Sequence, residues 1–141
     1  MKYFLSALVG ICIYSFSMGQ QAIKFPELET MLNKKNDTVY VFNFWDTWFS
    51  PCVKELPSFE KITSAYGDKK VKVILVSLDF KRELETKLKP FIQKNKIQST
   101  VFLLDEHDYN AWLDKIDASW GGAIPATLLV NATEDAVPEH I

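Results

Sequence analysis

The stretch that decides the fold is residues 41–57, VFNFWDTWFSPCVKELP. Its first part is rich in β-branched and aromatic residues, and residues 38–45 are therefore predicted to form a strand buried on both faces. Ser50 is expected to cap a helix over residues 51–66, because serine accepts a hydrogen bond from the first turn and a proline fits that turn. A kink is expected at Pro57, which has no N–H to donate to the helix.

Predicted strands and helices alternate along the rest of the chain. Further strands are expected at residues 71–78, 99–105 and 126–131, and further helices at residues 26–36, 82–95 and 107–116. This alternation implies right-handed βαβ crossovers, a mostly parallel sheet and helices that cover both of its faces. The predicted fold class is therefore α/β. If the last strand lies at the edge of the sheet, its outer backbone groups have no partner there.

Length, composition and charge limit the possible functions. The chain has 141 residues, of which 48% are hydrophobic and 24% are charged, as expected for one globular domain with a substantial core. The net charge is −2 and no basic stripe stands out. Nucleic-acid binding is disfavoured, because it depends on clustered lysine and arginine.

The first part of the chain has the pattern of a secretory signal. Residues 1–19, MKYFLSALVGICIYSFSMG, contain one charged residue, a short apolar run and then small residues. The apolar run is shorter than the roughly 20 residues of a membrane span. Cleavage between Gly19 and Gln20 is predicted, which leaves one domain over residues 20–141 without a stable membrane span. Two alternatives stay open, a lipid-modified Cys12, disfavoured by the bulky residue before it, and an uncleaved N-terminal anchor.

Cleavage would leave Cys52 as the only cysteine. Exported proteins meet an oxidising environment, in which disulfides are normally built in pairs. A single cysteine is then either a buried, inert thiol or a thiol that pairs with another molecule.

Two motifs, together with the order of the predicted elements, resemble the thioredoxin superfamily. Residues 43–57, NFWDTWFSPCVKELP, resemble the strand end, Trp-Cys-x-Pro-Cys site and following helix of its TlpA/ResA-like branch of exported bacterial thiol-disulfide oxidoreductases. Residues 122–131, GAIPATLLVN, resemble the loop with a cis-proline and the strand after it. The resemblance covers about residues 38–131. It implies a thioredoxin-like three-layer α/β/α sandwich with a mostly parallel central sheet.

The resemblance also assigns roles at the first motif. Trp48 matches the tryptophan before the redox pair, and Pro51 matches the proline within it. Cys52 matches the second, resolving cysteine. Glu55 matches an acidic residue that assists proton transfer near the dithiol.

At the second motif, Pro125 matches the cis-proline beside the active site. Ile124 matches the residue whose backbone binds an extended substrate. Asn43 stands where shorter thioredoxins have a buried aspartate, as is common in this branch.

The sequence departs from the family in two places. Phe49 stands where the family has its attacking cysteine, and the chain stops before the family's final strand and last helix, which are therefore expected to be missing. Thiol-disulfide exchange needs an attacking thiolate and a second thiol that releases the mixed disulfide. Phe49 supplies neither, so the ordinary two-thiol cycle is excluded. Cys52 is more simply interpreted as a small buried hydrophobe than as a reactive thiol.

Other polar and aromatic residues carry weaker expectations. Asp46 is expected to be an exposed loop acid, and Asp79 to belong to a solvated surface. Trp48 and Trp120 either flank a binding groove or pack within their loops, and the sequence favours neither. His107 and His140 are too isolated for a metal site and are expected to be surface or capping residues. No metal and no cofactor is expected.

Three functions remain open from the sequence. The first is an exported thioredoxin-like protein of the thiol-disulfide oxidoreductase family, located in the periplasm or envelope of a Gram-negative bacterium, with its catalysis impaired or reduced to single-thiol chemistry at Cys52. The second is a non-catalytic module whose groove at Trp48, Phe49, Ile124 and Pro125 binds extended peptides or a partner. The third and least favoured is a single-cysteine peroxide reductase, which needs threonine or serine where Phe49 stands. Protein thiols or extended peptide segments are the expected partners.

Overall fold

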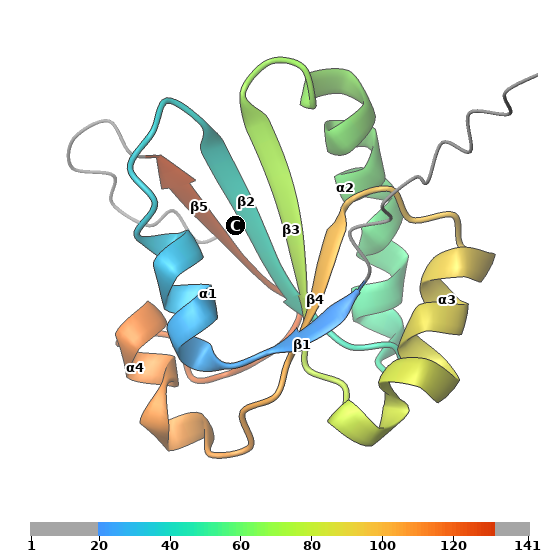
Figure 1. The fold of residues 1–141 in the computed structure, drawn as a ribbon, viewed down its shortest axis with the longest axis vertical. Helices are drawn as coiled ribbons and strands as arrows, with labels where there is room; N and C mark the ends of the chain where they lie inside the picture. The colour runs from blue at the N-terminus through green and yellow to red at the C-terminus, as the bar shows by residue number, and fades with distance from the viewer. Residues whose placement is uncertain (1–19, 132–141) are drawn as a thin grey trace, which may run out of the picture.

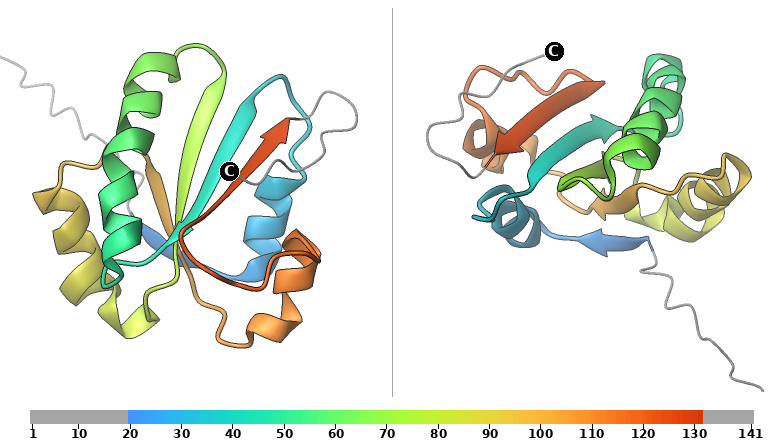
Figure 2. Two further views of the ribbon diagram at one scale, coloured as in Figure 1. Left: turned by 180° about the vertical axis from the view of Figure 1, so that it is seen from behind. Right: turned by 90° about the horizontal axis from the view of Figure 1, so that it is seen from above.

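The computed structural model describes residues 20–131, in which a five-stranded sheet lies between two layers of helices (Figures 1 and 2). The strands are β1 (Gln21–Ile23), β2 (Val39–Trp45), β3 (Val71–Ser77), β4 (Thr100–Leu104) and β5 (Ala126–Asn131). The α-helices are α1 (Phe25–Leu32), α2 (Ser50–Tyr66), α3 (Lys89–Lys94) and α4 (Leu113–Ile116). Shorter helical turns are η1 (Lys81–Glu83), η2 (Leu84–Leu88) and η3 (Tyr109–Ala111). None of the helices in this part of the chain is both long and apolar enough to cross a membrane.

The strand order is β1-β4-β3-β2-β5, and every neighbouring pair is parallel except β2 and β5. The prediction of an α/β fold with a mostly parallel sheet is therefore confirmed. Strand β5 is antiparallel to β2, with Phe44 opposite Ala126 and Val39 opposite Asn131. The chain thus enters β5 beside the carboxyl end of β2, which brings two segments distant in sequence to one end of the sheet.

Side chains of the central strands alternate between two apolar cores, one on each face of the sheet. On β2, Val41 and Trp45 pack into the core under α2 and α3, together with Leu56 and Ile92. The next residues along the strand, such as Phe42, pack into the opposite core under α1 and α4. Because both faces are covered, the central strands are apolar along most of their length, and this pattern made them predictable.

The helix after β2 begins one residue earlier than predicted. Ser50 is not its N-cap: Phe49 is, and Ser50 and Pro51 are the first two helical residues. Helix α2 continues through Pro57 to Tyr66. Proline at this internal position removes one helical hydrogen bond without ending the helix.

The helices predicted over residues 82–95 and 107–116 are each divided. The first becomes η1, η2 and α3, and the N–H of Lys89 bonds the carbonyl of Leu84, five residues back. Pro90, which cannot continue an α-helical ladder, accounts for the wider turn before it. The second becomes η3 and the short α4, with Trp112 buried between them.

The other boundaries differ by a few residues. Helix α1 ends at Leu32 rather than residue 36, and β1 was not predicted. Two predictions concern residues outside the described range. One is the signal segment, residues 1–19. The other is the absence of a final strand and helix after residue 131.

Candidate functional site

The turn between β2 and α2 presents two aromatic side chains to solvent. Phe49, the N-cap, has extended backbone, and its carbonyl accepts hydrogen bonds from the N–H groups of Cys52 (3.0 Å) and Val53 (3.2 Å). Trp48 is 68% exposed and Phe49 36% exposed, and their ring centroids lie 6.2 Å apart. The position that the resemblance assigns to an attacking thiol is therefore occupied by an aromatic ring at the surface.

The Cys52 thiol lies beneath this turn and is completely buried. It packs with Trp45 and Leu56 in the core under α2. Burial raises the pKa of the Cys52 thiol above its ordinary value, and the nearby carboxylates of Asp46, Glu55 and Asp79 raise it further. The thiol is therefore protonated at neutral pH, which supports its interpretation as an inert, space-filling side chain.

Asp46 does not have the expected exposed position. Its side chain is 1% exposed, and Oδ1 accepts a hydrogen bond from the N–H of Phe49 at 2.8 Å. Burial raises the pKa of the Asp46 carboxyl, and the charge of Asp79 adds to the rise, while the hydrogen bond from Phe49 opposes it. The aspartate thus accepts from the backbone of the N-cap residue, three positions further along the chain, as short polar side chains often do with nearby backbone groups.

Asp79 is also buried rather than solvated, at 2% exposure. Both carboxylate oxygens accept from the backbone N–H of Thr47 at 3.2 Å, and Oδ1 also accepts from its hydroxyl at 2.7 Å. The hydroxyl of Ser77 donates to Oδ2 at 2.6 Å. These bonds join the loop after β3 to the loop after β2 and hold the backbone beside Trp48 in place.

The loop before β5 reaches the same end of the sheet. The Ile124–Pro125 peptide bond is cis, both side chains are half-buried, and Ile124 packs against both cores. Asn43, which is buried, donates from its amide to the carbonyl of Ala126 and the hydroxyl of Thr127, each at 3.3 Å. The side chain at this position therefore ties β2 to the start of β5.

Trp120 packs within its own part of the fold. Its ring lies 4.8 Å from Phe44 and 6.0 Å from Trp112 between centroids, and Nε1 donates to the carbonyl of Ala123 at 2.9 Å. Of the two interpretations of this tryptophan, the contacts favour loop packing over a groove wall.

Glu55 is exposed on α2.

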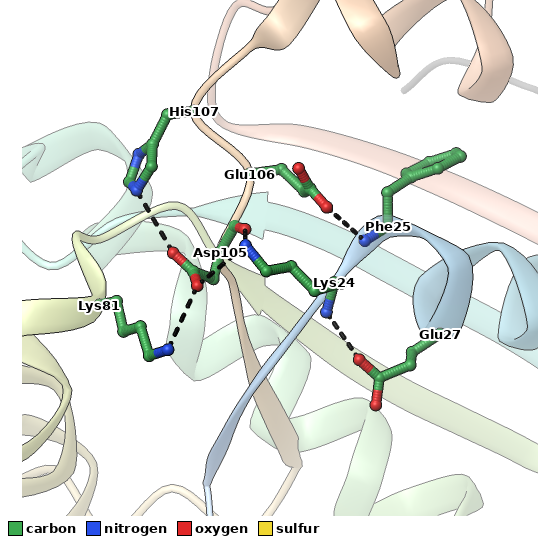
Figure 3. Close-up of polar contacts among 7 residues, drawn as sticks. All are labelled: Lys24, Phe25, Glu27, Lys81, Asp105, Glu106 and His107. Carbon is green, nitrogen blue, oxygen red and sulfur yellow. Dashed lines mark hydrogen bonds and ion pairs between the residues drawn. The ribbon is translucent and has the colours of Figure 1, made fainter.

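A charged cluster lies at the same end of the sheet, beyond β3 (Figure 3). The Asp105 carboxylate lies 3.1 Å from Nζ of Lys24, 3.5 Å from Nζ of Lys81 and 3.3 Å from Nε2 of His107. The hydrogen bond from Lys24 is the main reason why the pKa of the Asp105 carboxyl is below its ordinary value. This cluster joins β1, η1 and the loop after β4. His107 is a surface residue, as expected, and His140 lies outside the described residues.

Within residues 20–131, no three histidine, cysteine or acidic side chains form a group that could hold a metal ion. The site is therefore built from aromatic rings, a buried thiol, two buried carboxylates and the loop that contains Pro125. The structure brings Trp48, Phe49, Ile124 and Pro125 to one end of the sheet, with Cys52 beneath the surface.

This fold and site define a thioredoxin-like protein of the TlpA/ResA-like branch. Residues 10–135 match the AhpC/TSA family, and the chain belongs to that family. The thiol-disulfide oxidoreductase ResA of Halalkalibacterium halodurans is 28% identical over 127 residues, which cover 86% of this chain and 67% of the relative. The sporulation thiol-disulfide oxidoreductase A of Bacillus subtilis is 32% identical over 71 residues, but the match spans only 42% of that protein.

Solved structures show the same fold. The crystal structure of StoA from Bacillus subtilis has a TM-score of 0.56 at 22% identity and covers 76% of this chain and 75% of its own. The solution structure of a thiol:disulfide interchange protein from Bacteroides sp. has a TM-score of 0.58 at 26% identity and covers 72% of this chain and 63% of its own.

Burial of Cys52 predicts slow reaction with thiol reagents. With Ellman's reagent at neutral pH, we expect folded residues 20–141, in which Cys52 is the only cysteine, to react at least about 100-fold more slowly than the same chain in guanidinium chloride, because the thiol is both covered and protonated. A folded protein that reacts as fast as the unfolded one at neutral pH would contradict this assignment.

Burial of Asp46 predicts a pH-dependent loss of stability. Because its pKa is raised in the folded state, its contribution is fully present below the ordinary pKa near 4 and is lost as pH rises through the raised value. Asp46→Asn keeps an oxygen acceptor and has no proton to lose. Relative to wild type, its free energy of unfolding should therefore increase between about pH 4 and pH 7.

Urea unfolding of both proteins across this range measures the difference. Asp68→Asn, at an exposed position in the turn after α2, is the matched control and should leave the difference from wild type constant. A constant or decreasing difference for Asp46→Asn would show that the Asp46 carboxylate is not destabilised by folding.

Proposed function

We propose that this protein is an exported thioredoxin-like member of the thiol-disulfide oxidoreductase family that has lost the two-thiol reaction and kept the binding of extended protein segments. The observation that supports this most directly is the pairing of an exposed Phe49 with a fully buried Cys52. One residue has no nucleophilic atom, and the other has no access to solvent. The exposed side chains at this turn are aromatic rings, which are suited to binding other protein segments.

The chemistry of the two positions argues against turnover. Exchange requires a thiolate that attacks a disulfide and a second thiol that resolves the product. Cys52 lies in the first turn of α2, where the helix dipole favours a thiolate, but burial acts in the opposite direction and the net pKa shift is upward. A single protonated thiol cannot sustain this cycle.

Binding needs only what the surface provides. Trp48 and Phe49 offer aromatic area, and large aromatic side chains are enriched among the residues that dominate binding energies. Beside them, the backbone at Ile124 precedes β5 and is suited to strand-like pairing with an extended peptide. Segments of client proteins, including those that contain thiols or disulfides, are the proposed partners.

Single-thiol chemistry is the second candidate, because Cys52 occupies the resolving position of the family. A mixed disulfide would form there only if the turn over Cys52 opened. Peroxide reduction is less favoured, since the hydroxyl expected three residues before the cysteine is replaced by the hydrocarbon ring of Phe49.

The proposed export rests on residues 1–19, whose composition is that of a secretory signal.

Restoring the missing cysteine tests the loss of the reaction. In the dithiothreitol-driven reduction of insulin, wild type should not exceed the uncatalysed rate, and Phe49→Cys should accelerate it at least about tenfold, because a Cys-x-x-Cys pair at a helix start supplies both thiols. Phe49→Ser is the matched control: it removes the aromatic ring at residue 49 without adding a thiol and should stay inactive. Turnover by wild type would show that the reaction is not lost.

Removing the exposed tryptophan tests the binding surface. The probe is a fluorescein-labelled decapeptide with an alternating valine and threonine core and two flanking glutamines, followed by fluorescence anisotropy. Trp48→Ala should weaken its binding about tenfold, the effect of losing about 1.4 kcal/mol of contact. Tyr66→Ala removes another exposed aromatic ring at the opposite end of α2 and should leave binding unchanged. Equal binding by wild type and Trp48→Ala would overturn the proposed surface.

A further inference from the structure

We propose that the binding surface at Trp48 and Phe49 extends over Phe80 and Arg82, and that this extension selects extended peptide segments that contain acidic side chains. The inference deepens the proposed function and rests on it, because it names the chemistry of the segment bound at the same surface. It depends on three observations: the connection between two loops, the position of Arg82 and the local distribution of charge.

The loops that contain Trp48 and Phe80 are held side by side. Asp79 accepts three hydrogen bonds from Thr47, and the N–H of Leu78 donates to the carbonyl of Trp45 at 2.8 Å. Phe80 and Trp48 each follow directly after a residue of this junction. Phe80 is 47% exposed, so a third large aromatic side chain is exposed on a loop that is hydrogen-bonded to the loop of Trp48.

Arg82 is placed over this third ring and makes no direct ion pair within residues 20–131; the charge of the next residue, Glu83, acts on it from a distance, but the Glu83 carboxylate itself binds Nζ of Lys87 at 2.7 Å. Its guanidinium carbon lies 4.8 Å from the centroid of Phe80, and the imidazole of His107 stacks on the same ring at 6.1 Å. Among residues 20–131, no carboxylate lies within ion-pair distance of Arg82. An ordered guanidinium with free donors is suited to bidentate binding of a carboxylate.

The loops that form the surface have basic side chains only, and the acid that follows them, Glu83, is ion-paired with Lys87. In residues 47–51, 80–82 and 120–125, the ionisable side chains are Lys81 and Arg82 alone, although the whole chain has a net charge of −2. Lys81 already contacts Asp105, as Figure 3 shows, which leaves Arg82 as the available cation. Asp46 and Asp79 lie beneath the surface with their oxygens hydrogen-bonded, and on α2 the exposed Lys54 and Glu55 offset each other. An acidic segment therefore complements this surface and a basic one does not.

The experiment compares three decapeptides that share the valine and threonine core and differ only in two flanking residues, which are both glutamate, both glutamine or both lysine. Binding to the full chain is measured by fluorescence anisotropy at low and high salt. We expect the glutamate peptide to bind about fivefold more tightly than the glutamine peptide at low salt, and the lysine peptide to bind most weakly. The difference should shrink at high salt, because exposed charges are screened.

Arg82→Gln should abolish the preference for glutamate over glutamine, so that the two peptides bind equally to this variant. Lys94→Gln, which removes an exposed charge from α3, is the matched control and should keep the preference. Thermal unfolding of both variants verifies that the fold is intact.

The outcomes separate this inference from the proposed function. Equal binding of the three peptides, with Trp48→Ala still weakening all of them, would overturn the acidic preference and leave the binding surface standing. A preference that survives in Arg82→Gln would also overturn it. No binding of any peptide to wild type would overturn both proposals together.

Discussion

The end of the sheet that forms the candidate site depends on the hydrogen bonds between Thr47 and the carboxylate of Asp79. Strands β2 and β3 are parallel neighbours, so their carboxyl ends meet, but the chain then departs in different directions, into α2 and into η1. A buried carboxylate is costly unless its oxygens are hydrogen-bonded. Here Thr47 and Ser77 supply the donors. Trp48 and Phe80 are thus exposed on a fixed backbone, and a surface that is already ordered loses less conformational entropy when it binds.

Two physical effects compete at Cys52, and burial prevails. The first turn of a helix stabilises a thiolate by about 0.3–1 kcal/mol at an exposed position. Removing the thiolate from water costs more, and the carboxylates of Asp46 and Asp79 add repulsion, so the pKa rises. Phe49 contributes through its size, because its ring stands where the attacking sulfur would meet solvent. The phenylalanine at residue 49 and the burial of Cys52 therefore both act against thiol chemistry at this turn.

Much of the fold could be predicted from the sequence, because the elements buried between two layers have distinctive patterns. Strands β2, β3 and β5 are mostly apolar runs, and α2 begins with Ser-Pro. Strand β1 has only three residues, and it becomes a strand by pairing with β4, about 80 residues away. No local pattern encodes such a pairing. The division of residues 82–95, in contrast, was predictable from the sequence, because Pro90 lies within this range and proline interrupts an α-helical hydrogen-bond ladder.

The candidate site was predicted in its aromatic and thiol positions but not in its carboxylates. Trp48, Phe49 and Cys52 follow from the motif alone. Asp46 and Asp79 each follow a strand, and a polar residue there is ordinarily solvated. Their burial is decided by partners: Phe49 for one, and Thr47, 32 residues away in sequence, for the other. A single sequence contains the donors and acceptors without showing which of them meet.

A binding surface can outlast the thiol reaction because the two depend on different atoms. Strand-like pairing uses the backbone near Ile124, and apolar contact uses aromatic rings, neither of which requires sulfur. In a two-thiol enzyme, covalent capture holds the client, and the surrounding contacts need only position it. Without capture, residence time depends on the contacts alone, since differences in affinity lie mostly in dissociation rates. In the proposed binding function, the ring of Phe49 supplies apolar contact at the position where the family has its attacking cysteine. Backbone pairing is indifferent to sequence, so selectivity must come from the side chains around it.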